Sequence, residues 1–315
     1  MTRIQSLLVT GSKGFVASSF LDHLATLPIE ERPVNLGLVA RSVPPQFPDE
    51  LAAHTKITHI EVDLIKPWEF KYPATHIAHF AADGSANAYS KEAAGHFVSM
   101  VEHLISWSAE LDSPTVFLAS SGACSGHRPI GEGIVEQDSG SVERKALFVK
   151  SRLTAENKLR QAHDKGDVDL RIGRLYSFIG RHLFEKPHYA VSSFVNMALD
   201  KKNIEIEGNP RTTRSYLSAA DMSDWIYRSL GPEVGSENLS IGSEKPVTMK
   251  ELADHIAGVT GSTVTLLKPT IAGDYYVANN RETRTRLLVQ ERTSWQTAVD
   301  EYLAFVQEKR SNAHR

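Results

Sequence analysis

The fold of this chain is decided by one stretch near its start, Leu7-Leu8-Val9-Thr10-Gly11-Ser12-Lys13-Gly14-Phe15-Val16-Ala17. A short apolar run ends in two glycines three positions apart, and apolar residues follow at helical spacing, which predicts a strand, a tight turn and the start of a helix. Backbone N–H groups in such a turn can approach an anion, and the helix dipole favours negative charge there. A dinucleotide pyrophosphate is the usual occupant, so we expect a cofactor site at this turn.

The composition excludes several classes of protein. Of the 315 residues, 41% are hydrophobic and 23% are charged, with a formal net charge of −3. No basic block or polybasic helix is present, so we expect neither a nucleic-acid nor a membrane partner. No apolar run approaches the roughly 20 residues that span a bilayer, and the N-terminus lacks the apolar core of a signal peptide.

The cysteines and histidines of the chain bear on its cellular compartment and on metal binding. Cys124 is the one cysteine of the chain, which rules out an internal disulfide framework and favours a reducing, cytoplasmic location. The 13 histidines are scattered, and His76 and His79 lack a set of further ligands nearby in the sequence, so we expect no metal site.

The chain as far as residue 178 alternates between short apolar runs and amphipathic segments. Further strands are expected at 34–40, 57–64, 75–82, 114–119 and 168–174, and long helices at 91–110 and 145–163. This alternation predicts an α/β fold with a doubly wound parallel sheet that is covered on both faces.

Beyond Gly180 the regular alternation of strand and helix segments ends. Helices are expected at 193–199, 221–230, 249–259 and 297–309, and strands at 204–206 and 237–242. We therefore divide the chain into a nucleotide-binding domain, 1–178, to which 213–242 returns, and a smaller α/β lobe, 179–315, that lies over the carboxyl ends of the strands, where ligands bind in such sheets.

Three positions bear on the kind of dinucleotide. Arg41, and not an acid, follows the second strand, and Lys13 in the first turn adds a second positive charge, which favours the 2′-phosphate of NADP over NAD. Alternatively, Arg41 is a solvated loop residue. Asp63, at the end of the third strand, is suited to accept from the adenine amino group, or it caps the following turn.

These segments resemble the extended short-chain dehydrogenases/reductases, in particular the NAD(P)-dependent nucleotide-sugar epimerases, dehydratases and reductases. Residues 10–17 are similar to the family's TGxxGFxG turn, with Ala17 in place of the last glycine, and 120–126 resemble its SSGAVYG stretch. Residues 174–180, 214–217 and 239–243 resemble the segments that open and continue the substrate lobe.

The resemblance implies a Rossmann-type fold with a substrate lobe and a bound nicotinamide dinucleotide. The residues expected to bind that cofactor are Thr10, Gly11, Lys13, Gly14, Phe15, Val16, Arg41, Asp63, Leu64, Phe80, Ala81, Ala82 and Arg152.

The catalytic motif of the family is altered. The family carries Tyr-x-x-x-Lys on the helix after the serine loop, with a glutamate four residues later, whereas this chain carries Phe148 and Arg152, with Glu156 in register. Phenylalanine has no proton to exchange. Arginine keeps the positive charge that holds the nicotinamide ribose, but in a fixed fork geometry. General acid–base help is worth about 10²–10⁴ in rate, so its loss without replacement is severe.

Four nearby positions refine this expectation. Ser121 stands at the hydrogen-bonding position and could orient a carbonyl. Tyr176, at the end of the sixth strand, is the nearest replacement phenol, although packing is the commoner role for such an aromatic residue. Gly122 stands where 4,6-dehydratases carry an acid, which argues against dehydration. Cys124 is expected to be a small buried side chain.

Arg214 is the candidate for the diphosphate of the substrate, because its planar guanidinium suits bidentate phosphate binding. The full set of expected substrate residues is Ser121, Gly122, Ser177, His188, Asn196, Arg214 and Arg281.

Two functions from different classes follow. The first is an NADP- or NAD-dependent enzyme that reduces or epimerises a nucleotide-linked sugar at C4; a reductase of another small carbonyl compound is a variant of it. The second is a catalytically silent family member that binds the cofactor as a sensor or partner protein. The helices near Phe97–Ile105 and Arg152–Leu159 resemble those of a four-helix dimer contact in this family, so we expect a homodimer.

Overall fold

The computed structural model describes residues 3–42, 45–82, 89–126, 128–130, 139–185, 189–267 and 273–313. Its centre is a seven-stranded sheet in the order β11-β7-β5-β4-β1-β2-β3, in which every neighbouring pair is parallel. The strands are β1 (Ser6–Thr10), β2 (Asn35–Ala40), β3 (Lys56–Glu61), β4 (His76–His79), β5 (Thr115–Ser121), β7 (Asp169–Leu175) and β11 (Asn238–Ile241).

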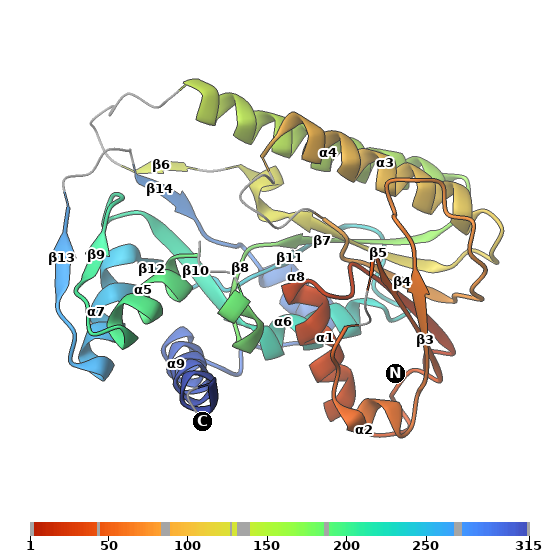
Figure 1. Cartoon of the computed structure of the whole chain (residues 1–315). Helices are drawn as coiled ribbons and strands as arrows, with labels where there is room; N and C mark the ends of the chain where they lie inside the picture. The colour runs from red at the N-terminus through yellow and green to blue at the C-terminus, as the bar shows by residue number, and fades with distance from the viewer. Residues whose placement is uncertain are drawn as a thin grey trace.

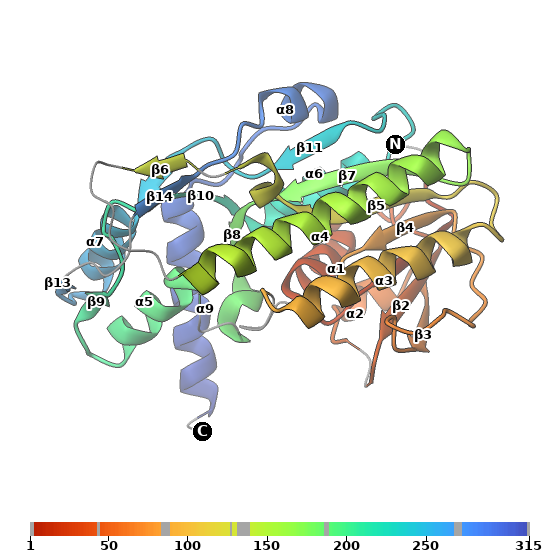
Figure 2. The same cartoon turned by 90° about the horizontal axis from the view of Figure 1, so that it is seen from above.

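Helices cover both faces of this sheet (Figures 1 and 2). On one face α3 (Lys91–Ser108) and α4 (Ser139–Asp164) lie side by side, and on the other α1 (Phe15–Thr26) contacts α6 (Ala219–Ser229). The short helices α2 (Asp49–Ala52) and α8 (Arg281–Leu287) lie beside α1 and β11. Because both faces are covered there, the inner strands β1 and β2 are almost continuous apolar runs, whereas the edge strand β3 is largely polar and exposed.

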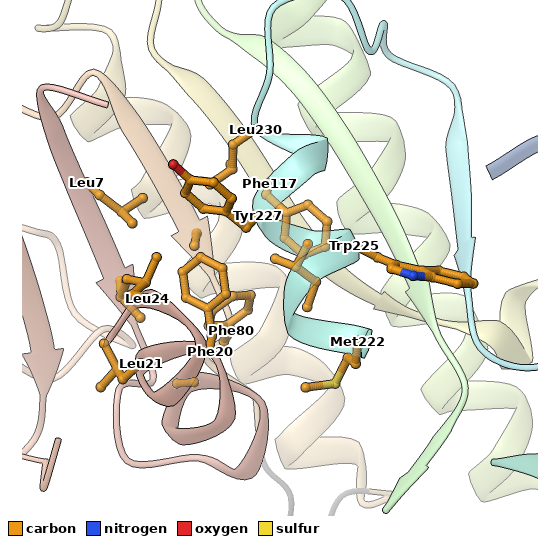
Figure 3. Close-up of a cluster of buried hydrophobic side chains, with 14 of the residues drawn as sticks. Leu7, Phe20, Leu21, Leu24, Phe80, Phe117, Met222, Trp225, Tyr227 and Leu230 are labelled. Atoms are coloured by element: carbon orange, nitrogen blue, oxygen red, sulfur yellow. The ribbon is translucent and has the colours of Figure 1, made fainter. Parts of the chain in front are cut away.

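The core beneath α1 and α6 is built around aromatic rings (Figure 3). Phe80 meets Phe20 edge to face at 5.4 Å between ring centroids, and Phe117 in the same manner at 6.0 Å. Trp225 of α6 is fully buried in the same cluster. Phe80 therefore anchors the end of β4 to α1, and this packing fixes the place where the first turn meets the sheet.

The second lobe has its own sheets and core. Strands β12 (Pro246–Thr248), β10 (Thr213–Ser218), β14 (Gly273–Tyr276) and β6 (Arg128–Ile130) are neighbours in that order, β8 (Ser177–Ile179) also pairs with β10, and β9 (Ile204–Ile206) pairs with β13 (Val264–Leu266). Helices α5 (Ala190–Leu199), α7 (Met249–Thr260) and α9 (Trp295–Ala313) enclose a separate apolar cluster. Two short 3₁₀ turns, η1 (Gly122–Ser125) and η2 (Arg181–Glu185), follow β5 and β8.

The α/β architecture with a parallel sheet is confirmed, and most differences in detail lie in the second lobe. The segment before α6 is the strand β10, and β8, β12 and β14 had no strand assigned to them from the sequence. Of residues 213–242, α6 and β11 join the layers of the large sheet, whereas β10 lies in the five-stranded sheet. None of the helices among the described residues is long and apolar enough to cross a membrane.

The turn after β1 depends on the absence of a side chain at Gly11. Its φ is 65°, and a Cβ placed there would stand 2.7 Å from the Cα of Ala81, just past β4. The N–H of Gly14 closes the turn on the carbonyl of Gly11 at 2.9 Å, and α1 begins at the next residue. The turn thus brings the N-terminus of α1 to the carboxyl ends of β1 and β4.

Replacing Gly11 by alanine tests this close approach. The variant should lose at least about 2 kcal/mol of unfolding free energy, because the left-handed backbone and the contact with Ala81 both oppose a Cβ. Gly95→Ala is the matched control, since a Cβ at this exposed position in α3 meets nothing within 4 Å. It should gain about 0.5–1 kcal/mol by helix propensity in the same urea titration. Equal stability of both variants would contradict the packing described here.

Candidate active site

The first turn offers an anion an uncapped helix start. Gly14 is the N-cap of α1 and provides no side-chain hydrogen bond, so the first N–H groups of the helix have no side-chain partner from the cap. Gly14 and Lys13 are exposed, and Phe15 and Val16 are half-buried behind them. With Gly11 pressed onto β4, these groups fit a dinucleotide pyrophosphate, which needs close backbone approach and N–H donors.

A basic edge flanks this turn. The backbone N–H and the hydroxyl of Ser12 both donate to the carbonyl of Val39, at 3.2 and 2.9 Å, which ties the turn to the end of β2. Lys13 follows Ser12 directly, and Arg41 follows β2, and both are exposed. The turn and the strand end therefore present two cations at one edge of the site.

Asp63 and Leu64, the two residues predicted to lie near adenine, have structural contacts within the chain. The Asp63 carboxylate accepts from the N–H of Ile65 at 3.3 Å, which is the turn-capping alternative. Leu64 is buried in the core under α3, and its carbonyl accepts from the indole of Trp68 at 3.1 Å. Contact of either residue with adenine stays a prediction.

A buried polar pair lies beneath the cofactor turn. The hydroxyl of Thr10 and Nδ1 of His79 are 2.9 Å apart. Burial, with a smaller effect from the nearby Arg152 charge, lowers the pKa of His79 to about 3, so the imidazole is neutral. Ala81 is buried and Ala82 is exposed just beyond β4. His79 thus holds the ends of β1 and β4 together and carries no charge at neutral pH.

The altered pair of α4 forms a stacked cation. The guanidinium of Arg152 lies 3.5 Å from the ring centroid of Phe97 and 4.4 Å from that of Phe148, and the arginine side chain is buried. Tyr89, before α3, places its ring 5.0 Å from Phe148. A planar cation over two aromatic rings is favourable. Phe148 and Arg152 therefore contact each other directly in the folded chain.

Glu156, one turn further along α4, organises the serine loop. It accepts from the Ser120 hydroxyl at 2.5 Å and from Arg174 at 2.8 Å, and it is buried. The Cys124 thiol lies 3.8 Å from the Ser120 hydroxyl, and burial, followed by the Glu156 charge, raises its pKa. The thiol is therefore protonated and is no nucleophile.

Ser121 lies at the carboxyl end of β5, opposite Leu175 of β7. Its hydroxyl accepts from the N–H of Ala123 at 3.2 Å and so starts the η1 turn. This position, one strand away from the end of β4, is where a sheet of this topology presents ligand-binding groups.

Tyr176 packs on glycines. A Cβ at Gly122 would stand 2.6 Å from its ring, and one at Gly242 would stand 2.7 Å from its Cβ. The ring therefore covers Gly122, which leaves no room there for the acid that dehydratases carry, and it lies 4.8 Å from the ring of Tyr276.

Tyr276 is the residue that sequence reasoning missed. It closes β14, pairs in register with Arg214, and donates its hydroxyl to the carbonyl of Leu175 at 3.3 Å. Leu175 pairs with Ser121 in the β5–β7 ladder, so the phenol lies beside the end of β5. Tyr275 and Tyr276 favour a strand, but Gly273 and Asp274 do not, and the residues around Tyr276 give no sign of its neighbour Leu175.

The predicted substrate residues are dispersed. Arg214 is paired with Asp274 at 2.5 Å and is a quarter exposed; Ser177 is half-buried in β8. The Asn196 amide oxygen accepts from Arg310 of α9 at 2.8 Å, so its contact with a sugar stays a prediction. Arg281 is exposed at the start of α8. His188 lies outside the described residues, among which no three metal-ligating side chains gather.

The chain is similar to known proteins in sequence and in fold. A UDP-glucuronic acid decarboxylase of Arabidopsis thaliana is 30% identical over 110 residues, which cover 35% of this chain and only 24% of that protein. The structure of MoeE5 in complex with UDP-glucuronic acid and NAD has a TM-score of 0.76 at 19% identity, covering 96% of this chain and 99% of that one. A UDP-N-acetylglucosamine 4-epimerase from Methanobrevibacter ruminantium M1 has a TM-score of 0.77 at 15% identity, covering 98% and 100%.

At these identities the solved structures establish the fold. The model of the family described as "NAD dependent epimerase/dehydratase" matches residues 7–242, which is most of the chain. The chain belongs to the NAD dependent epimerase/dehydratase family.

Proposed function

We propose that this protein binds a nicotinamide dinucleotide and catalyses 4-keto reduction or 4-epimerisation of a nucleotide-linked sugar. The observation that carries the proposal is the position of Ser121 at the end of β5, next to a glycine turn that fits a pyrophosphate. The relatives named for NAD and UDP-sugars support the substrate class. The dinucleotide, when bound, supplies or accepts the hydride.

The residues of the first turn, with Gly11 and the N-terminus of α1, would hold the pyrophosphate. Arg152 would face the nicotinamide ribose with a charge fixed by its two aromatic neighbours. Ser121 would donate to the carbonyl or hydroxyl oxygen at the reacting carbon. Arg214 would bind the substrate diphosphate, and to do so it must exchange its partner Asp274 for the phosphate oxygens.

Substitution of Ser121 by alanine tests the enzyme. Purified protein should oxidise NADPH when it is given a panel of 4-keto nucleotide sugars, and Ser121→Ala should lower kcat about 10²-fold or more, because a donor to the reacting oxygen is lost. Ser125→Ala, four residues further on and exposed, is the matched control and should keep its activity.

The alternative, a silent family member, is favoured by one observation, the loss of the tyrosine at Phe148 and the lysine at Arg152. If the protein is such a silent member, the wild type should bind the dinucleotide without turnover, and the double variant Phe148→Tyr, Arg152→Lys should gain activity. Turnover by the wild type that falls in Ser121→Ala excludes this alternative.

The proposed cofactor is NADP in preference to NAD, on the strength of Lys13 and Arg41 at one edge of the turn. NADPH should bind more tightly than NADH, and Arg41→Ala should weaken NADPH by about tenfold while leaving NADH unchanged, because one charged contact to the 2′-phosphate is lost. Fluorescence titration measures both affinities. Equal loss for both dinucleotides, or tighter NADH binding by the wild type, would contradict the assignment.

We further propose a cytoplasmic homodimer that pairs through the outer faces of α3 and α4. Leu153 on α4 is a partly exposed apolar residue on this pair of helices. Light scattering should give twice the chain mass of 34.8 kDa. A mass of one chain would exclude the dimer.

A further inference from the structure

Three strands converge on one phenol. Tyr276 ends β14, and the β10–β14 register places it opposite Arg214. Its hydroxyl donates to the carbonyl of Leu175, and Leu175 is the direct neighbour of Ser121 in the β5–β7 ladder. The phenol is thus fixed by backbone pairing at the place where the substrate lobe meets the carboxyl ends of the large sheet.

The hydroxyl of Tyr276 hydrogen-bonds the carbonyl of Leu175, the residue that pairs with Ser121. An oxygen held by the Ser121 hydroxyl would therefore lie near a second O–H group. Proton transfer needs this kind of reach, about 2.6–3.2 Å between heavy atoms directly or through one water.

The other phenols of the cleft are less suited. The Tyr176 ring is wedged against Gly122 and Gly242. Tyr89 lies against Phe148 and is 44% exposed. Among the described tyrosines, Tyr276 is the one whose hydroxyl hydrogen-bonds the strand neighbour of Ser121.

We propose that Tyr276 is the proton donor to the reacting oxygen of the nucleotide-linked sugar, in the role left open by Phe148. This inference rests on the proposed function and names the group that moves the proton in it.

The step balances as follows. The carbonyl carbon takes up a hydride from the reduced nicotinamide dinucleotide, the carbon–oxygen π bond breaks, and the oxygen takes the proton of the Tyr276 hydroxyl. The substrate is reduced to the alcohol and the dinucleotide is oxidised. The phenolate that remains regains a proton from solvent.

The surroundings of Tyr276 act on the pKa of its phenol in both directions. Burial raises this pKa, and Tyr176 and Tyr89 raise it further, whereas Ser121 and Arg214 lower it. The phenol is therefore protonated at neutral pH and has a proton to give to a nascent alkoxide.

The experiment compares Tyr276→Phe with Tyr176→Phe and Tyr89→Phe, each of which loses one hydroxyl. Turnover of 4-keto nucleotide sugars with NADPH is measured together with two properties that do not depend on turnover, the dissociation constant of NADPH and the near-ultraviolet pH titration of phenolate. Tyr276→Phe should lose about 10²–10⁴-fold in kcat, the usual worth of a general acid. Its NADPH affinity should be unchanged, and its titration should lack one phenol that ionises above the ordinary pKa of tyrosine.

Tyr275→Phe, which loses the neighbouring exposed hydroxyl on β14, is the matched control and should keep kcat within about threefold. An active wild type whose Tyr276→Phe variant keeps its kcat, or whose activity is lost in Tyr89→Phe or Tyr176→Phe instead, overturns the assignment while the proposed function stands. A wild type that binds NADPH but neither reduces a keto sugar nor epimerises a nucleotide-linked sugar overturns both. If Tyr276→Phe fails to bind NADPH, Ser121→Ala decides: a drop in its kcat together with a raised phenolate pKa supports the link, because Ser121 lowers that pKa, and an unchanged kcat refutes it.

Discussion

The contact between the backbone of Gly11 and that of Ala81 is the constraint on which the rest of the site depends. A Cβ on residue 11 would stand 2.7 Å from the Cα of Ala81, so only a glycine fits there, and its backbone is left-handed. This contact sets the ends of β1 and β4 side by side and aims the first turn of α1 at the space above them. The buried Thr10–His79 pair lies directly below and holds the same two strand ends together.

Around this fixed turn lie the groups to which we assign the chemistry. The guanidinium of Arg152 is held between the rings of Phe97 and Phe148. Ser121 lies at the end of β5, and the phenol of Tyr276, on β14, hydrogen-bonds the carbonyl of its strand neighbour Leu175. The proposed reacting position thus draws on both parts of the chain.

The sequence predicts the first of these parts well, because its signals are local. The apolar run into Gly11 and the helical spacing after Phe15 are sufficient for the strand, the turn and the helix. The second part depends on pairing between distant segments. Strand β14 is four residues long and pairs with β10 about 60 residues away, so no local pattern reports that Tyr276 hydrogen-bonds the strand neighbour of Ser121.

Packing determines the surroundings of two side chains that the sequence offers as site residues. The sequence indicates Tyr176 as the nearest phenol because it ends a strand, and in the structure its side chain packs against Gly122 and Gly242. Arg214 carries the charge expected of a phosphate ligand, yet its pairing with Asp274 means that binding must compete with an ion pair. Neither contact has a signature in the sequence around it.

The central claim is that the turn at Gly11 binds a nicotinamide dinucleotide. Calorimetric titration of the purified protein with NADPH and with NADH tests it most directly. The account predicts saturable binding of at least one of them at a single site per chain, and loss of that binding in Gly11→Ala. No measurable binding of either dinucleotide to the folded wild-type protein would contradict it.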